Sequence, residues 1–391
     1  MNTTKNSPWG NLVGIRPVKR VVKMMMDGLS DNEITSVLKN DFFVSDKKID
    51  LAMSIAKTEL KVMKTIPENA VSLYIDIPFC PSKCVYCSFA SMPVSEMKDF
   101  IEPYLNALFC ELDTIKKIIT DLKLKIISVY IGGGTPTSIL SLELDNLLYK
   151  IVNTFDLSNC LEFTIEAGRP DTITERKLSV MKKYGVDRIS INPQTMNDKT
   201  LEIIGRKHTV KEIYDAFSLA KSFDFKCINM DVIAGLPKES VQEFCYTIDA
   251  VTDLNPENIT VHTMSIKRAA RLNQDKDFVG LPQDNDVSKM IDYAHERLAK
   301  CSYRPYYLYR QKNILGDLEN TGFSKGDTEG IYNICMMEEI RSVISAGVGA
   351  VTKLVRGDRI ERIFNVKDVR EYLNRDEEMR RRKDYIYEFM K

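Results

Sequence analysis

The chain has 391 residues, of which 44% are hydrophobic and 28% charged, and its 55 Lys and Arg residues balance 55 Asp and Glu residues. This length allows one large domain with appendages or two to three average domains. Because the formal net charge is zero, no global field attracts the chain to nucleic acid or to an anionic membrane surface, so neither partner is expected.

No apolar run reaches the roughly 18 residues of a membrane span, and the first residues lack the charged-then-apolar layout of a secretory signal. We therefore expect a soluble, cytoplasmic protein. The nine cysteines are then expected to be reduced thiols, because disulfides rarely persist in a reducing compartment. Clustered cysteines become candidates for metal binding.

Residues 1–70 are predicted to form a small helical region. Pro17 fits the first turn of a helix, where no backbone donor is needed. Ser30 and Ser45, each followed by aspartate, are good N-caps for two further helices.

Residues 71–300 alternate short β-branched runs with longer amphipathic ones. The strands are expected at 72–77, 126–132, 161–167, 187–192, 227–236 and 258–264. The helices are expected at about 95–119, 141–154, 173–184, 210–222, 239–252 and 285–300. Strict alternation of this kind predicts an α/β fold with a parallel sheet, either open or closing toward a barrel.

Residues 301–391 are predicted to be an α+β extension that covers the substrate. The extension opens with "YRPYYLYRQ", and "YNICMMEEIRSVI" at 332–344 is a helix candidate. The densely charged "NRDEEMRRRKDYIYEF" is expected to be an exposed terminal helix.

Residues of types that bind ligands or take part in catalysis lie at or after the ends of the predicted strands. Three cysteines follow the first strand and "GGGTPT" follows the second, while the others carry, in chain order, Glu166, Gln194, Asp231 and His262. In parallel sheets the ligand lies at the carboxyl ends of the strands. These residues are therefore expected to share one site.

The three cysteines Cys80, Cys84 and Cys87 have the spacing C-x3-C-x2-C. A structural zinc site needs a fourth ligand, and none of the three histidines lies nearby in sequence. An electron-transfer cluster also needs four thiolates, and the fourth could come only from a distant cysteine. An iron with an open position for a ligand is the simpler interpretation, because metal sites that perform chemistry keep such a position free.

This triplet resembles the signature of the radical S-adenosylmethionine enzymes. The blocks "YIDIPFC", "GGGTPT", "TIEAGRP", "INPQTMND", "GRKHT" and "DVIAGLP" resemble, in this order, the oxygen-independent coproporphyrinogen III oxidase family. "PWGNLVGIRPVK" and "VHTMSIKRA" are similar to its HemZ-type coproporphyrinogen dehydrogenase branch. The resemblance spans nearly the whole chain and implies a partial (β/α)6 barrel.

The resemblance also implies the cofactors and their ligands. Cys80, Cys84 and Cys87 would bind a [4Fe-4S] cluster whose open iron takes S-adenosylmethionine. The residues that match S-adenosylmethionine-binding positions are Tyr74, Tyr86, Gly133, Gly134, Thr135, Glu166, Gln194, Arg206 and Asp231. Tyr74 is also the catalytic candidate, Tyr86 would lean on the adenine, Glu166 suits an ammonium group, and Arg206 suits a carboxylate.

The implied reaction converts two propionates of coproporphyrinogen III into vinyl groups through a 5′-deoxyadenosyl radical, giving protoporphyrinogen IX in porphyrin biosynthesis. The implied partners are a tetrapyrrole substrate and a small electron-donor protein of flavodoxin or ferredoxin type. Candidate substrate contacts are Lys267, Arg268, Arg304, Tyr303, Tyr306, Tyr307 and Tyr309. A strand packed on the barrel is the more ordinary explanation of the tyrosines.

Two departures from the family leave alternatives open. The best-known oxidases carry a fourth cysteine where this chain has Phe89, and phenylalanine there is shared with the haem-chaperone branch. That branch carries an H-N-x-x-Y-W motif, which is missing here, since the one tryptophan is Trp9. A haem-binding chaperone, or a radical enzyme acting on another tetrapyrrole, for example opening haem by methyl transfer, therefore stays possible.

Overall fold

The protein is seen in a computed structural model that describes residues 7–12, 14–267 and 280–391. Six neighbouring strands form its centre, and each pairs with the next in parallel. These strands are β1 (Ala70–Ile77), β4 (Lys125–Gly133), β5 (Glu162–Glu166), β6 (Arg188–Ser190), β7 (Cys227–Ala234) and β8 (Asn258–Thr263). The predicted parallel α/β sheet is confirmed.

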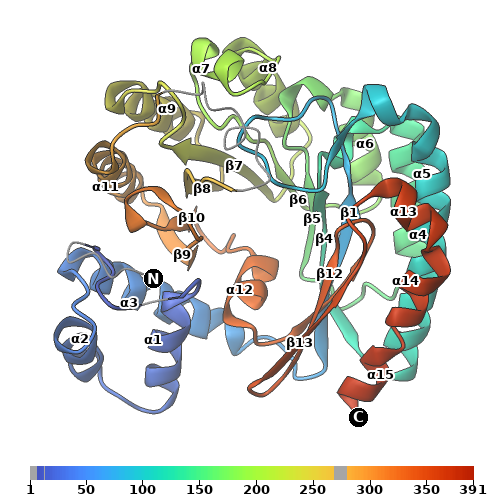
Figure 1. The fold of residues 1–391 in the computed structure, drawn as a ribbon, viewed down its shortest axis with the longest axis horizontal. Helices are drawn as coiled ribbons and strands as arrows, with labels where there is room; N and C mark the ends of the chain where they lie inside the picture. Colours follow the sequence, from blue (N-terminus) through green and yellow to red (C-terminus); the bar gives the residue numbers. More distant parts are fainter. Residues whose placement is uncertain (1–6, 13, 268–279) are drawn as a thin grey trace.

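Helices cover the outer face of the curved sheet (Figure 1). They are α4 (Val94–Asp121), α5 (Ser141–Thr154), α6 (Glu175–Lys183), α7 (Asp198–Ile203), α8 (Val210–Lys221), α9 (Val241–Leu254) and α11 (Asp284–Lys300). Their buried faces, such as Leu105, Leu108 and Leu112 of α4, meet the strand residues in one large apolar core. The strands are buried on both faces, as expected of a parallel sheet enclosed by helices. The sheet is a partial barrel.

The C-terminal third of the chain extends this sheet at both edges. β9 (Arg304–Tyr309) and β10 (Asn320–Ser324) add antiparallel strands beside β8. At the other edge β11 (Ser342–Ala346) pairs with β1 in parallel, followed by β12 (Val351–Arg356) and β13 (Arg359–Phe364). The predicted helix at 332–344 is thus wrong in its second half, because residues from Ser342 onward pair with β1.

Helix α12 (Ile331–Glu338) lies between the two ends of the sheet and contacts β4 and β9 (Figure 1). Its first residue is held by a side chain from β5, since the Ile331 amide donates to Glu162 Oε2 at 2.5 Å. The Tyr332 ring stacks on that of Tyr130 in β4, with 4.3 Å between centroids. The helix ends at Glu339, whose backbone is left-handed. α12 therefore forms a wall inside the partial barrel.

The three predicted N-terminal helices are confirmed as α1 (Pro17–Met26), α2 (Asp31–Asn40) and α3 (Asp46–Met63). They form a second apolar core with Trp9, and Leu308 of β9 belongs to it. Lys48 Nζ lies 2.5 Å from Glu319 Oε1, and Trp9 Nε1 donates to the other oxygen of Glu319 at 2.8 Å. This region is thereby fastened to the β9–β10 edge.

The charged C-terminus forms three short helices rather than one exposed helix. They are α13 (Val369–Asn374), α14 (Asp376–Arg382) and α15 (Tyr385–Met390). Met379, Lys383, Ile386 and Phe389 are buried, and α13 and α14 contact α4. The expectation of an exposed helix was wrong because charged residues alternate with inward-facing ones.

The remaining elements are short. They are β2 (Phe79–Cys80), β3 (Met92–Pro93), and the 3-10 turns η1 (Pro136–Ser138), η2 (Pro170–Thr172) and η3 (Leu315–Asp317). No helix in the described ranges is both long and apolar enough to cross a membrane.

Candidate active site

One cavity of about 380 Å³ lies at the carboxyl ends of the central strands. The predicted site residues that line it are Cys80, Cys84, Cys87, Tyr86, Gly133, Gly134, Thr135, Glu166, Gln194, Arg206 and Asp231. They come from β2, β4, β5 and β7 and from the segments that follow β2, β4, β6 and α7, so the fold brings together residues that are far apart in sequence. Tyr74 is the predicted site residue outside this lining.

The cysteine loop leaves β2 at Cys80 and folds into a turn in which the Cys87 amide donates to the Cys84 carbonyl at 3.2 Å. Burial, with the neighbouring thiols acting in the same direction, raises the pKa of Cys80 and raises that of Cys87 to about 11. Three adjacent thiolates therefore need a positively charged group between them. Binding to iron supplies that compensation.

Across the described ranges, no three His, Cys, Asp or Glu side chains lie close enough to hold a single metal ion. The C-x3-C-x2-C loop suits an iron–sulfur cluster, in which each cysteine binds a different iron atom.

The glycine turn after β4 is pressed against the strand that leads to Cys80. Gly133 has φ of +100°, and a Cβ there would lie 2.3 Å from Asp76 Oδ2. A Cβ on Gly134 would lie 2.6 Å from the carbonyl oxygen of Phe79. The Thr135 amide donates to that same carbonyl at 2.7 Å, and its hydroxyl lies 3.5 Å from Cys80 Sγ. Only glycine fits these two positions, and the turn and the cysteine loop form one unit.

Glu166 ends β5 and faces the cavity with one hydrogen bond, received from the Tyr130 hydroxyl at 2.6 Å. Burial raises the pKa of Glu166 to about 7, and the charge of Asp231 contributes in the same direction. The carboxylate is thus costly to ionise without a cation beside it. It is suited to a cationic ligand group.

Gln194 adopts φ of +68°, which is uncommon for a residue other than glycine. Its backbone bridges to β7, since its amide donates to Asp231 and its carbonyl accepts from Ile233. Its side-chain Oε1 is buried and has no hydrogen-bond partner in the part of the chain described. Strained backbone and an orphaned acceptor together are typical of a ligand site.

Arg206 makes more hydrogen bonds within the protein than its implied role as a ligand contact would suggest. Its Nη1 donates to the carbonyls of Asn192 and, at 3.4 Å, Gly168, and its Nη2 donates to the Tyr86 hydroxyl at 3.3 Å. Its Nε is buried and has no partner within the described residues. The Nε donor is therefore available to a ligand, while Nη1 is held by backbone carbonyls and Nη2 supports Tyr86.

Asp231, His262 and Tyr309 line the cavity side by side from β7, β8 and β9. His262 Nε2 lies 3.5 Å from Asp231 Oδ2, and its Nδ1 lies 3.4 Å from the Tyr309 hydroxyl. Burial raises the pKa of Asp231, but the hydrogen bond and charge of His262 outweigh it and the net shift is downward. Asp231 is accordingly an anionic group in this wall.

Tyr74 lies behind the cavity wall. Its hydroxyl donates to Asp76 Oδ2 at 3.2 Å, and its ring stacks with Tyr130 at 6.2 Å and Tyr332 at 6.1 Å between centroids. Its contact with a ligand stays a prediction. In this structure it supports the side chains beneath Gly133 and Glu166.

The predicted substrate contacts divide into two groups. Lys267, Tyr307 and Tyr309 line the cavity. Arg304 is exposed, and Tyr303 and Tyr306 are buried outside the lining, with Tyr303 donating to the Pro256 carbonyl at 2.6 Å. Arg268 lies outside the described residues. Tyr303 and Tyr306 pack in the interior, while a substrate contact by Tyr307, Tyr309 or Lys267 stays a prediction.

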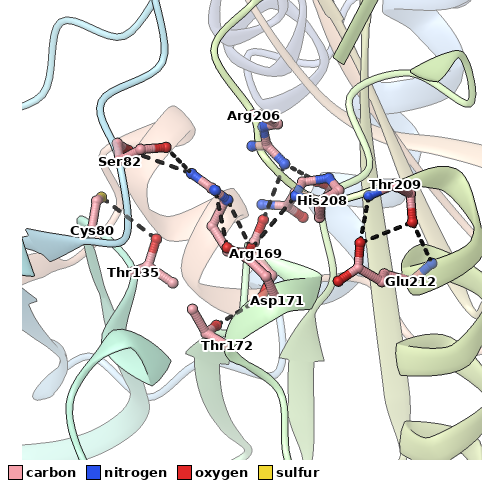
Figure 2. Close-up of polar contacts among 12 residues, drawn as sticks. Cys80, Ser82, Thr135, Arg169, Asp171, Thr172, Arg206, His208, Thr209 and Glu212 are labelled. Carbon is pink, nitrogen blue, oxygen red and sulfur yellow. Dashed lines mark hydrogen bonds and ion pairs between the residues drawn. The ribbon is translucent and has the colours of Figure 1, made fainter. Parts of the chain in front are cut away.

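The sequence interpretation missed Arg169, which also lines the cavity and contacts the cysteine loop at Ser82 (Figure 2). The available signal was an arginine just after the strand that carries Glu166. Charged residues at that place are common in surface loops, so the pattern alone does not single it out.

The sequence profile described as the Radical SAM superfamily matches residues 74–251. The chain is 42% identical over 374 residues to the oxygen-independent coproporphyrinogen-III oxidase-like protein HemZ of Bacillus subtilis, covering 94% of this chain and 75% of HemZ. It is 34% identical over 268 residues to the heme chaperone HemW of Bacillus subtilis, covering 67% of this chain and 66% of HemW.

Among solved structures, the coproporphyrinogen III oxidase HemN of Escherichia coli, described as a radical SAM enzyme, aligns with a TM-score of 0.64. The alignment covers 82% of this chain and 72% of HemN at 22% identity, which shows a common fold. Together with the extent of the similarity to HemZ, the profile shows the family. The chain belongs to the radical SAM superfamily and, within it, to the HemZ-like group of oxygen-independent coproporphyrinogen-III oxidase-like proteins.

Proposed function

We propose that this chain is a radical S-adenosylmethionine oxidoreductase that converts two propionate side chains of coproporphyrinogen III into vinyl groups without oxygen. The observation that carries the proposal is the meeting of a three-cysteine loop, a glycine turn and the orphaned Gln194 acceptor in one cavity. The 42% identity to HemZ supports the choice of reaction.

The residues present fit the two cofactors that the superfamily implies. Cys80, Cys84 and Cys87 would hold a [4Fe-4S] cluster, and the wall made by the glycine turn, Glu166 and Gln194 would hold S-adenosylmethionine. When bound, these groups supply the one-electron chemistry that leads to hydrogen abstraction from the substrate. Ionised Glu166 would accept from an ammonium group, and Gln194 Oε1 would accept from a ligand donor.

Another part of the cavity lining suits a tetrapyrrole. The rings of Tyr307 and Tyr309 offer flat apolar surface to a macrocycle. Lys267 extends a positive charge into the same cavity, where it would pair with a propionate. These side chains would orient the substrate and exclude water from the reacting carbon. A small electron-donor protein of flavodoxin or ferredoxin type would supply the electron.

The test is an anaerobic product assay. The chain is reconstituted with iron and sulfide and incubated with S-adenosylmethionine, a strong reductant and coproporphyrinogen III, and products are analysed by mass. We expect 5′-deoxyadenosine together with products that have lost one and two carboxyl groups. Absence of both would refute the proposal, and a matched reaction without reductant is the control.

A haem-binding chaperone is the second candidate, because Phe89 lies at the cavity with 63% of its surface exposed, where a further cysteine is expected of the oxidases. The 34% identity to HemW points the same way. This candidate predicts tight haem uptake, seen as a Soret band, with no decarboxylated product. A mass shift of haem itself would indicate instead a radical enzyme that acts on another tetrapyrrole.

A further inference from the structure

A buried arginine holds the loop between the first two cysteines. Arg169 follows β5, is 3% exposed and lines the cavity. Its Nη1 donates to the Ser82 hydroxyl at 3.1 Å and to the Ser82 carbonyl at 3.4 Å (Figure 2). Ser82 lies midway between Cys80 and Cys84, so the guanidinium is hydrogen-bonded directly to the cysteine loop.

Asp171 fixes the orientation of this guanidinium. Its two carboxylate oxygens accept from Arg169 Nε and Nη2, each at 3.1 Å, in a parallel pair of bonds (Figure 2). His208, whose side chain is fully buried, places its Nδ1 3.5 Å from Asp171 Oδ1. Bidentate pairing of this kind constrains geometry as well as charge.

The loop has a second anchor on the segment after α7. The Ser82 hydroxyl donates to the Gly205 carbonyl at 3.1 Å, and the Val85 amide donates to the Ile204 carbonyl at 3.1 Å. Ser82 thus lies between Arg169 on one side and Gly205 on the other. Two separate parts of the barrel therefore fix the loop in place.

We propose that Arg169, oriented by Asp171, is a positioning residue that pre-forms the Cys80–Cys84 loop for cluster binding and sets the charge beside the cluster. The inference rests on the proposed assignment of Cys80, Cys84 and Cys87 as cluster ligands. Residues that orient metal ligands contribute about 10- to 100-fold to metal retention. A nearby cation also favours the reduced, more negative state of a cluster.

Cluster retention tests the positioning role. Wild type and the variants R169Q, R169K and S82A are reconstituted, and iron release to a chelator is timed. We expect release to be about tenfold faster in all three, because lysine keeps the charge but cannot reproduce the fork. R176Q, which changes an exposed arginine of α6, should match wild type. Wild-type release from both R169K and S82A would overturn the positioning role.

S82A keeps the test informative if R169Q does not fold, since it removes one hydroxyl from the loop and no charge from the interior. Circular dichroism checks the fold of each variant. If wild-type protein takes up no cluster, the ligand assignment falls and this inference falls with it. If wild type holds its cluster and S82A and R169K hold it equally well, only this inference falls.

The reduction potential separates this role from a merely structural one. R169Q removes a positive charge and D171N removes a negative one, so their midpoint potentials should shift in opposite directions, downward for R169Q and upward for D171N. R169K should stay near wild type. The potentials are measured by monitoring the reduced cluster with electron paramagnetic resonance. Shifts of the same sign in R169Q and D171N would overturn the electrostatic role.

Discussion

Lys383 and Glu111 form an ion pair in the interior, with Nζ 3.1 Å from Oε1 and side chains that are 0% and 1% exposed. Lys383 comes from the turn between α14 and α15, and Glu111 comes from the middle of α4. Glu111 also accepts from the Gly347 amide at 2.9 Å and from the Tyr372 hydroxyl at 2.6 Å. The pair therefore links the C-terminal helices, α4 and the turn after β11.

Replacing Lys383 by methionine should strongly destabilise the fold. The Glu111 carboxylate would remain buried without its cation, and breaking a buried pair costs about 3–5 kcal/mol. Urea unfolding followed by circular dichroism measures the change. K116M, which alters an exposed lysine of α4, the helix that carries Glu111, should change the free energy of unfolding by less than about 0.5 kcal/mol. Equal midpoints for the two variants would contradict the prediction.

Gly133→Ala should weaken S-adenosylmethionine binding by about tenfold or more, because relieving the overlap with Asp76 displaces the turn at a cost on the order of 1–3 kcal/mol. Isothermal titration of the reconstituted protein measures this. Gly185→Ala is a matched control, since Gly185 also has positive φ but has no atom within 4 Å of its Cβ position. Equal affinities in the two variants would contradict the close-approach argument.

Binding of S-adenosylmethionine should strengthen as the pH rises toward 7. The pKa of Glu166 is raised to about 7, so the carboxylate that accepts from a cation is largely neutral in more acidic solution. Below this pKa the affinity should fall by up to about tenfold per pH unit. E166Q should bind more weakly and without this dependence. Equal wild-type affinities at about pH 5.5 and about pH 7 would rule out this role.

The stability of the protein should fall as the pH rises through the range in which Glu59 and Glu338 lose their protons. Burial and their mutual repulsion raise the pKa of Glu59, and burial raises that of Glu338 to about 7. Hydrogen bonding with Glu59, and the charges of Lys19 and Arg16, partly offset the rise in the pKa of Glu338, whereas Glu339 adds to it. Raised carboxyl pKa values mean that the folded state holds more protons than the unfolded state above about pH 4.5. Folding therefore loses stability between that pH and the raised pKa values.

Urea unfolding at about pH 5 and about pH 8 measures the decrease in the free energy of unfolding. We expect this decrease to be on the order of 2 kcal/mol larger in wild type than in E59Q. E68Q, at an exposed position just after α3, should keep the wild-type loss. A wild-type loss no larger than that of E59Q would show that the pair does not titrate in this range.

Cys84→Ala should remove the visible absorption and the bound iron of reconstituted protein while leaving the far-ultraviolet circular dichroism unchanged. Cys84 is buried in the loop that faces the cavity, whereas Cys110 is exposed on α4. Cys110→Ala should therefore retain full iron. Full iron in Cys84→Ala would contradict the ligand assignment.

The central barrel could be predicted because each of its strands and helices is signalled by the residues of its own segment. Each strand has a β-branched run and each crossover an amphipathic period, and a parallel sheet then places the carboxyl ends of the strands together. For this reason Glu166, Gln194 and Asp231 could be assigned to one site, and the structure places all three around the cavity.

The sheet edges could not be predicted, because their pairing depends on distant partners. Ser342 continues an apolar helix-like run, yet it pairs with Val71 some 270 residues earlier. Lys383 lies in a charged stretch typical of a solvated helix, and its burial is explained by partners outside that stretch, namely Glu111, Asn365 and Thr352. Arg169 is similar, since its role depends on a serine in another loop.

Helix α12 lies outside the segment that matches the superfamily, yet Asn333 and Met337 on it line the cavity. The strands of residues 74–251 supply the cysteines and the glycine turn, while α12 covers Tyr130 from within through Tyr332. Cofactor chemistry and cavity depth are thus encoded in separable stretches of chain. Substitutions along α12 can therefore deepen or fill the chamber, and so change the size of ligand it admits, while the cysteine loop stays the same.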